Sequence, residues 1–235
     1  MKDAGVVDTI PNCLNRKPFY TKYTRRIFEA FARLVFRFYC PLEVSGSGNL
    51  PDGPFILCSN HASHMDSIVL MTASSHGFDR FGLLAASDYF FRSPLVYGCF
   101  SSMVNLIPIS RTRGAESFHH TLALCRRFVE PEGRNLIVFP EGTRSKDGRI
   151  GAFKPGIGIL AERLRIPIVP AYIDGTREAM PKGRLFPAHR RVVVRIGAPI
   201  YPHVNGNGSG RNHDWMATQA RSRIEEMKGD EAGAR

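Results

Sequence analysis

The sequence predicts an α/β fold, in which helices flank a mixed, mainly parallel sheet. Apolar runs of strand length alternate with helical stretches along most of the 235 residues, and this alternation is typical of such sheets. Two of the runs, residues 54–58 and 135–139, lead directly into turns that carry polar side chains. Ligands in open α/β sheets usually bind at strand ends of this kind. The chain is long enough to form one substantial domain.

After a loose arm at residues 1–20, the first expected element is an amphipathic helix over residues 24–39. Its apolar face has helical spacing and consists of Ile27, Phe28, Phe31, Leu34, Val35 and Phe38. The opposite face carries Arg26, Glu29, Arg33 and Arg37, while Phe36 departs from the pattern. The stretch is too short and too charged to span a bilayer. It is either an ordinary helix that covers the core or, as the aromatic face suggests, a helix lying in a membrane interface.

The remaining elements follow in order. Pro41 ends the first helix. Apolar composition predicts strands at residues 42–44, 54–58, 81–86, before Arg111, and at 135–139, 168–173 and 190–196. Helical spacing predicts helices that begin near residue 67 and cover 116–128 and 157–164, and a last helix over 214–227. Residues 88–100 are mixed, and no element is predicted there. Residues 203–212 are rich in Gly and Asn, which predicts a flexible linker.

Charge and cysteine content narrow the class of protein. With Lys+Arg 32 against Asp+Glu 21, the formal net charge is +11, which suits a negatively charged partner such as anionic lipid. No nucleic-acid-binding module is recognisable, which argues against a nucleic-acid partner. The cysteines are odd in number, scattered and without paired metal spacing, which favours a reduced, cytosolic setting; they are Cys13, Cys40, Cys58, Cys99 and Cys125.

The turn after the strand at 54–58 carries the first candidate site. His61 lies at a strand end, and Asp66 follows five residues later. Imidazole can take a proton from a hydroxyl near neutral pH, and a carboxylate on its other nitrogen would hold the tautomer. Two alternatives stay open. The pair can be a chance spacing, or His61, His64 and Asp66 can bind a metal, although metal-binding histidines on a helix are usually four residues apart.

A second candidate site follows the strand at 135–139. Pro140 ends the strand, Gly142 permits close approach of the backbone to a ligand, and Arg144 offers a planar fork for phosphate oxygens. Lys154, further along, is a weaker phosphate candidate. A plain Pro-Gly turn with a solvated arginine is the alternative.

Together these stretches resemble a known family. Asn60-His61-x4-Asp66 and the Phe-Pro-Glu-Gly-Thr-Arg-Ser run at 139–145 are similar to the first and third motifs of the glycerolipid acyltransferases, which include the bacterial 1-acylglycerol-3-phosphate (lysophosphatidate) acyltransferases. Residues 166–171 resemble the fourth motif. The resemblance covers residues 25–200. Members often have an N-terminal membrane-associated helical segment, so the resemblance favours the membrane interpretation of residues 24–39.

The second motif of the family is matched only in part. Arg111 and Ile109 agree with it, whereas Asn105 stands at its Gly position and Pro108 at its Phe position. Ser87 stands where members commonly carry a lysine. These departures leave the headgroup of the acceptor open.

The resemblance implies transfer of a fatty acyl group from an acyl thioester, acyl-CoA or acyl carrier protein, to the hydroxyl of a lysophospholipid. The expected acceptor is 1-acyl-sn-glycerol-3-phosphate, which would give phosphatidic acid. His61 would be the general base and Asp66 its orienting partner, and no metal or cofactor would be needed. The phosphate end of the acceptor would be held by Arg111, Glu141, Gly142, Thr143 and Arg144, with Glu141 orienting groups rather than touching phosphate, because two anions repel.

Other functions remain as alternatives. The same chemistry can act on glycerol-3-phosphate, another lysophospholipid or an amino-acid lipid; a lipid-binding protein and a metal-dependent hydrolase are the other classes. The expected organisation is an arm and interfacial helix at 1–40, an acyltransferase domain at 41–202, and a linker with a C-terminal helix at 203–235. The expected location is a membrane surface at the cytoplasmic face, without a spanning helix.

Overall fold

The computed structural model describes residues 21–86, 94–109, 115–181, 183–184, 186–202 and 211–232. The strands in these ranges form one seven-stranded sheet. Their order across the sheet is β1 (Leu42–Ser45), β7 (Val192–Ile196), β6 (Ile168–Asp174), β2 (Ile56–Ser59), β5 (Asn135–Val138), β3 (Phe81–Ala86) and β4 (Asn105–Ile109). Neighbouring strands pair in parallel except β6 and β7, which are antiparallel. The predicted α/β class with a mainly parallel sheet is confirmed.

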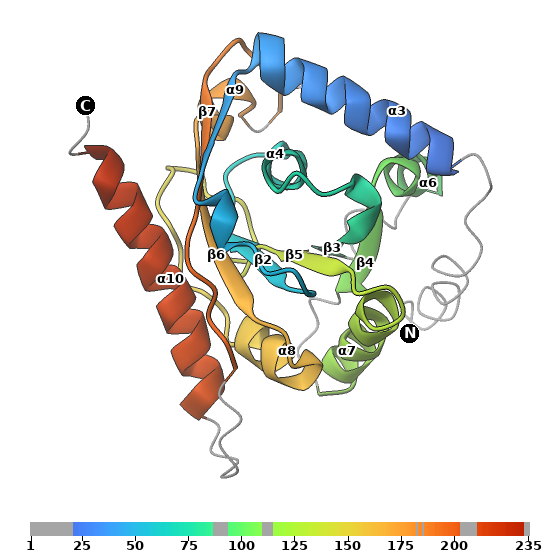
Figure 1. The fold of residues 1–235 in the computed structure, drawn as a ribbon, viewed down its shortest axis with the longest axis vertical. Helices are drawn as coiled ribbons and strands as arrows, with labels where there is room; N and C mark the ends of the chain where they lie inside the picture. Colours follow the sequence, from blue (N-terminus) through green and yellow to red (C-terminus); the bar gives the residue numbers. More distant parts are fainter. Residues whose placement is uncertain are drawn as a thin grey trace.

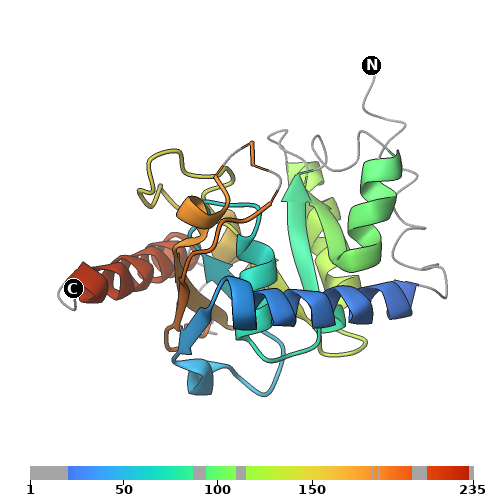
Figure 2. The same ribbon diagram turned by 90° about the horizontal axis from the view of Figure 1, so that it is seen from above.

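Helices cover both faces of the sheet (Figures 1 and 2). One face carries α3 (Thr21–Leu34), α4 (Asp66–Ala73) and α6 (Pro94–Met103). The other carries α7 (Ala115–Val129), α8 (Gly156–Leu164) and α10 (Arg211–Ala232). Short helical turns complete the order: η1 (Val35–Tyr39), η2 (Ser47–Asn49), η3 (Phe78–Arg80) and α9 (Thr176–Ala179).

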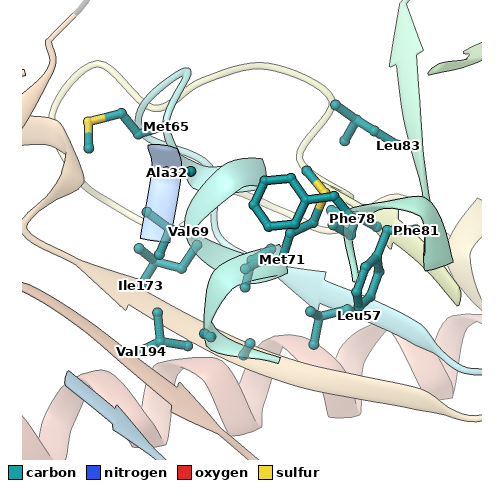
Figure 3. Close-up of a cluster of buried hydrophobic side chains, with 14 of the residues drawn as sticks. Ala32, Leu57, Met65, Val69, Met71, Phe78, Phe81, Leu83, Ile173 and Val194 are labelled. Carbon is teal, nitrogen blue, oxygen red and sulfur yellow. The ribbon is translucent and has the colours of Figure 1, made fainter. Parts of the chain in front are cut away.

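The central strands are buried on both faces, so their side chains divide between two cores. Leu57 of β2 and Ile137 of β5 belong to the core under α3 and α4, part of which Figure 3 shows. Their neighbours Ile56, Cys58 and Leu136 point to the core formed with α7, α8 and α10. This alternation with a period of two explains why these strands read as continuous apolar runs.

The first helix differs from its prediction. It begins at Thr21 and ends in the π-helical turn η1, whose wider winding brings Phe36 into the core, where it is 5% exposed. Phe28, predicted on the apolar face, packs edge-to-face on Phe78, with ring centroids 6.0 Å apart. What remains exposed is a row at helical spacing that we call the α3 stripe: Tyr23, Ile27, Phe31, Leu34 and Phe38. The helix therefore covers the core with one side and exposes apolar rings on another.

Two elements were not predicted, and one is longer than predicted. Helix α6 begins at Pro94, a residue that is favoured at the first position of a helix. Helix α9 is a single turn that follows β6, and α10 extends beyond the predicted 214–227 at both ends. Ser87, Arg111 and most of the predicted linker at 203–212 lie outside the described residues.

Candidate active site

The turn between β2 and α4 folds back on itself around one carboxylate. Nδ1 of His61 lies 2.8 Å from Oδ2 of Asp66. The same oxygen accepts hydrogen bonds from the backbone N–H groups of Ala62, at 2.7 Å, and Ser63, at 2.8 Å. Asp66 is the first residue of α4, where a negative charge is favoured by the helix dipole. The sequence prediction that His61 and Asp66 meet is therefore seen in the geometry.

The imidazole of His61 is held on several sides. Its ring stacks on Phe139, with centroids 4.0 Å apart and planes inclined by 15°. Its backbone N–H donates to Oε1 of Glu141, and its carbonyl accepts a hydrogen bond from the N–H of Ser145. The side chain of His61 is 21% exposed, whereas that of Asp66 is 1% exposed. Because Nδ1 faces Asp66, Nε2 is the nitrogen that is left to exchange a proton with a substrate.

Glu141 ties the two motif loops together. Oε1 accepts the N–H of His61 at 2.9 Å, and Oε2 accepts the N–H of Gly151 at 2.9 Å. Burial raises the pKa of Glu141, while these two N–H groups act in the opposite direction. Both carboxylate oxygens are thus occupied by backbone N–H groups.

The loop after β5 carries a cation that the sequence analysis ranked low. Gly142 has a left-handed backbone, with φ of 73°. A Cβ atom there would lie 2.6 Å from Nζ of Lys154, so the lysine side chain crosses directly over the glycine. The N–H of Lys154 donates to the carbonyl of Pro140, which fixes the two segments together. Thr143 is exposed beside them.

Arg144 and His64 extend this cluster. Nη1 of Arg144 is buried without a hydrogen-bond partner among the described residues. Burial lowers the pKa of His64, and the nearby charges of Arg144 and His61 lower it further, against an opposing effect of Asp66. These charge effects show that His64 lies close enough to Arg144, His61 and Asp66 for its protonation to depend on them. Within the described ranges, no group of three or more His, Cys, Asp or Glu side chains is placed to hold a metal ion.

The structure also shows what one departure at the second motif, Asn105, does. Asn105 is buried at the start of β4, and its side-chain Nδ2 donates to the carbonyls of Asp79 and Phe81. The residue thus fastens the edge of the sheet. Arg111, two residues beyond the end of β4, lies outside the described residues, so its predicted part in the site stays a prediction.

Two polar contacts were missed by the sequence analysis. Asn60 exchanges two hydrogen bonds with the backbone of Ile173, each 2.9 Å long. Thr176 donates from its hydroxyl to Oδ1 of Asp66 at 2.6 Å. Neither had a signal of its own, because each partner lies more than a hundred residues away along the chain.

The family is decided by a match over more than half of the chain. The model of the family described as Acyltransferase matches residues 41–174. This span includes His61, Asp66 and the loop from Glu141 to Arg144. The chain belongs to the acyltransferase family. The resemblance of its two main motifs to those of acyltransferases is thereby confirmed.

Similar proteins within and beyond plants agree with this assignment. The chain is 32% identical over 216 residues to the chloroplastic 1-acyl-sn-glycerol-3-phosphate acyltransferase BAT2 of Brassica napus, a match that covers 88% of this chain and 58% of that protein. It is 28% identical over 194 residues to the lyso-ornithine lipid O-acyltransferase of Brucella abortus, covering 78% of this chain and 68% of that one. The chain thus spans less than two thirds of the plant relative.

A solved structure shares the fold. The crystal structure of the 1-acyl-sn-glycerophosphate acyltransferase PlsC from Thermotoga maritima matches with a TM-score of 0.65 and 27% identity, over 88% of this chain and 81% of that one. The two structures therefore share their α/β fold over most of this chain.

Proposed function

We propose that this acyltransferase moves a fatty acyl group from an acyl thioester to the hydroxyl of 1-acyl-sn-glycerol-3-phosphate, giving phosphatidic acid. The observation that carries the proposal is the contact between His61 and Asp66, which leaves Nε2 of a partly exposed imidazole as a base. The relatives from Brassica napus and Thermotoga maritima, both named as acyltransferases of this acceptor, support this choice.

In the proposed reaction, Nε2 of His61 takes the proton of the acceptor hydroxyl while its oxygen attacks the thioester carbonyl. The tetrahedral intermediate then expels the thiolate, which receives that proton from His61. Asp66 stabilises the imidazolium between these two steps. The acyl group passes directly from sulfur to oxygen, so the route needs neither an acyl-enzyme nor a cofactor. Either acyl-CoA or acyl carrier protein can supply the thioester.

The phosphate of the acceptor is proposed to bind where the loop after β5 meets Lys154. Nη1 of Arg144 is buried and has no hydrogen-bond partner in the part of the chain that the structure describes, and the ammonium of Lys154 lies over Gly142. A guanidinium and an ammonium supplied by the two segments that meet at this loop suit a phosphate better than an uncharged headgroup. Glu141 is proposed to hold the loop in place, since both its oxygens already accept backbone N–H groups.

The α3 stripe is proposed to lie in a membrane interface. Ile27, Phe31 and Phe38 are each more than 60% exposed, and Lys22, Arg26 and Arg37 are exposed on the same helical segment. Apolar rings with neighbouring cations suit an anionic lipid surface. No helix in the described ranges is long and apolar enough to cross a membrane. A peripheral position at the cytoplasmic face, where the lipid acceptor would be reached, is the arrangement we propose.

Purified full-length chain should be assayed with acyl-CoA and acyl carrier protein thioesters against lysophosphatidic acid, glycerol-3-phosphate, lysophosphatidylcholine and lyso-ornithine lipid. The account predicts the highest kcat/KM with lysophosphatidic acid. Preferential use of lyso-ornithine lipid, which carries no phosphate, would overturn the proposed acceptor. Lipid binding without transfer from any donor would favour the non-enzymatic alternative.

A further inference from the structure

The catalytic turn is fastened by side chains to the segment that runs from the end of β6 through α9. Asn60 bonds in both directions with the backbone of Ile173. The hydroxyl of Ser63 donates to the carbonyl of Met180 at 2.8 Å. Between these two points, the hydroxyl of Thr176 donates to Asp66. The turn that carries the base is thus built against a segment more than a hundred residues later in the chain.

The two carboxylate oxygens of Asp66 accept hydrogen bonds from different donors. Oδ2 accepts from Nδ1 of His61 and from the N–H groups of Ala62 and Ser63. The hydrogen bond to Oδ1 comes from Thr176, at 2.6 Å. Both Asp66 and Thr176 are buried. A buried carboxylate oxygen without a donor is costly, so the threonine hydroxyl compensates a charge that water does not reach.

The residue before Thr176 is a glycine in a left-handed conformation that brings the backbone close to a neighbouring strand. Gly175 has φ of 80°, and a Cβ atom there would lie 2.2 Å from the carbonyl oxygen of Arg191. Only a glycine fits this conformation and this close approach. The family match ends at residue 174, so the contact to Asp66 comes from just beyond the matched region.

We propose that Thr176 is a positioning residue for the catalytic pair. A carboxylate rotates about its Cβ–Cγ bond, and a hydrogen bond at Oδ1 fixes that rotation. With Oδ1 held by Thr176, Oδ2 stays directed at Nδ1 of His61, and Nε2 keeps its orientation toward the acceptor hydroxyl. This inference rests on the proposed role of His61 as the base.

The test compares Thr176→Val, which removes the hydroxyl at nearly constant volume, with Thr176→Ser, which keeps it. Thr121→Val is the matched control, because Thr121 is also buried and donates its hydroxyl within α7 to the carbonyl of Ser117. Acyl transfer is measured with each substrate varied in turn. Thr176→Val should lower kcat about ten- to a hundredfold, as expected for losing one hydrogen bond to a charged group, with little change in either KM. Thr176→Ser and Thr121→Val should stay within a few-fold of wild type.

A second measurement needs no substrate. Proton NMR of wild type should show a far-downfield resonance for the Nδ1–H of His61, assigned by its loss in His61→Ala. The signal should persist in Thr176→Ser and weaken or shift in Thr176→Val; Thr176→Ala serves in its place if the valine variant does not fold. Equal impairment of the serine and valine variants, or unchanged kcat and resonance in the valine variant, would overturn the inference. Absence of acyl transfer in wild type would instead overturn the proposed function, and the NMR comparison would still decide the role of Thr176.

Discussion

Nζ of Lys154 lies in the space that a Cβ atom on Gly142 would need, only 2.6 Å from its position. The glycine therefore does two things: it adopts a left-handed backbone with φ of 73°, and it lets the side chain of Lys154 cross the loop. These two contributions can be separated, because Gly133 shares the first property without the second. Gly133 has φ of 58°, and a Cβ atom there would meet nothing within 4 Å.

Gly142→Ala should raise the KM for lysophosphatidic acid at least several-fold, because the new methyl group displaces the ammonium of Lys154. Gly133→Ala should leave that KM unchanged. Both variants should lose about 1 kcal/mol of unfolding free energy to left-handed strain. Steady-state kinetics and urea denaturation measure the two effects. Equal KM values in the two variants would contradict a role for Lys154 at the phosphate.

Arg144→Ala should raise the KM for a phosphate-bearing acceptor by about one to two orders of magnitude, since a hydrogen bond to a charged group contributes roughly 1.5–3 kcal/mol. The KM for the thioester should change far less. Arg144→Lys should restore binding only in part, because an ammonium lacks the planar fork. Arg149→Ala is the control, as Arg149 lies exposed on the same loop, paired with Asp147. If Arg144→Ala instead raised only the KM for the thioester donor, Arg144 would belong to the donor site and not to the acceptor site.

His64 should make the native state less stable as the pH falls. Burial, together with the charges of Arg144 and His61, lowers the pKa of His64 below its ordinary value of 6.5, and Asp66 only partly opposes this. The unfolded chain therefore binds a proton more readily than the native state as the pH falls through 6.5, and the free energy of unfolding decreases.

His64→Gln should remove this contribution. As the pH falls from about 7 to about 5, the unfolding free energy of the variant should therefore rise relative to that of wild type. Urea denaturation across this range measures the difference. His119→Gln, on the exposed side of α7, controls for the substitution itself. A difference between wild type and His64→Gln that does not vary with pH would show that His64 does not titrate in this way.

The α3 stripe should carry membrane binding. Replacing Ile27 and Phe31 together by Asp removes two exposed apolar side chains, each capable of contributing roughly 1.5–3 kcal/mol when buried in lipid. Co-sedimentation with phosphatidylglycerol vesicles should fall by roughly tenfold or more. Trp215→Asp is the control, since Trp215 is 40% exposed on α10, across the sheet from α3 (Figure 1). Undiminished vesicle binding by the double variant would show that another surface of the protein contacts the lipid.

Local patterns were enough to predict the strands of the sheet and the contact between His61 and Asp66. Apolar runs report burial on both faces, and a five-residue separation lets a turn close on itself. The side of the first helix that faces the core was harder to predict, because the apolar spacing of residues 24–39 does not show which rings pack against the core. Phe28 and Phe36 do so through Phe78 and the π-helical turn η1, both of which depend on tertiary packing.

Contacts between distant segments were beyond sequence reasoning. Thr176 lies 110 residues from Asp66, and a lone threonine carries no periodic or motif signal. For Lys154 the sequence favours a weak candidate, because a lysine near a turn is usually solvated; the role proposed for it depends on its crossing over Gly142. Motif residues can be predicted from the sequence. As both examples show, the residues that hold them in place are identified only from contacts in the folded structure.

We propose above that His61 is the base in acyl transfer to lysophosphatidic acid. The most direct measurement is the rate at which purified wild type and His61→Ala form phosphatidic acid from lysophosphatidic acid and an acyl thioester, with circular dichroism and the thermal midpoint as evidence that both are folded. Loss of a general base predicts a roughly 10²–10⁴-fold lower kcat for the folded variant. Near-normal phosphatidic acid formation by folded His61→Ala would contradict the mechanism.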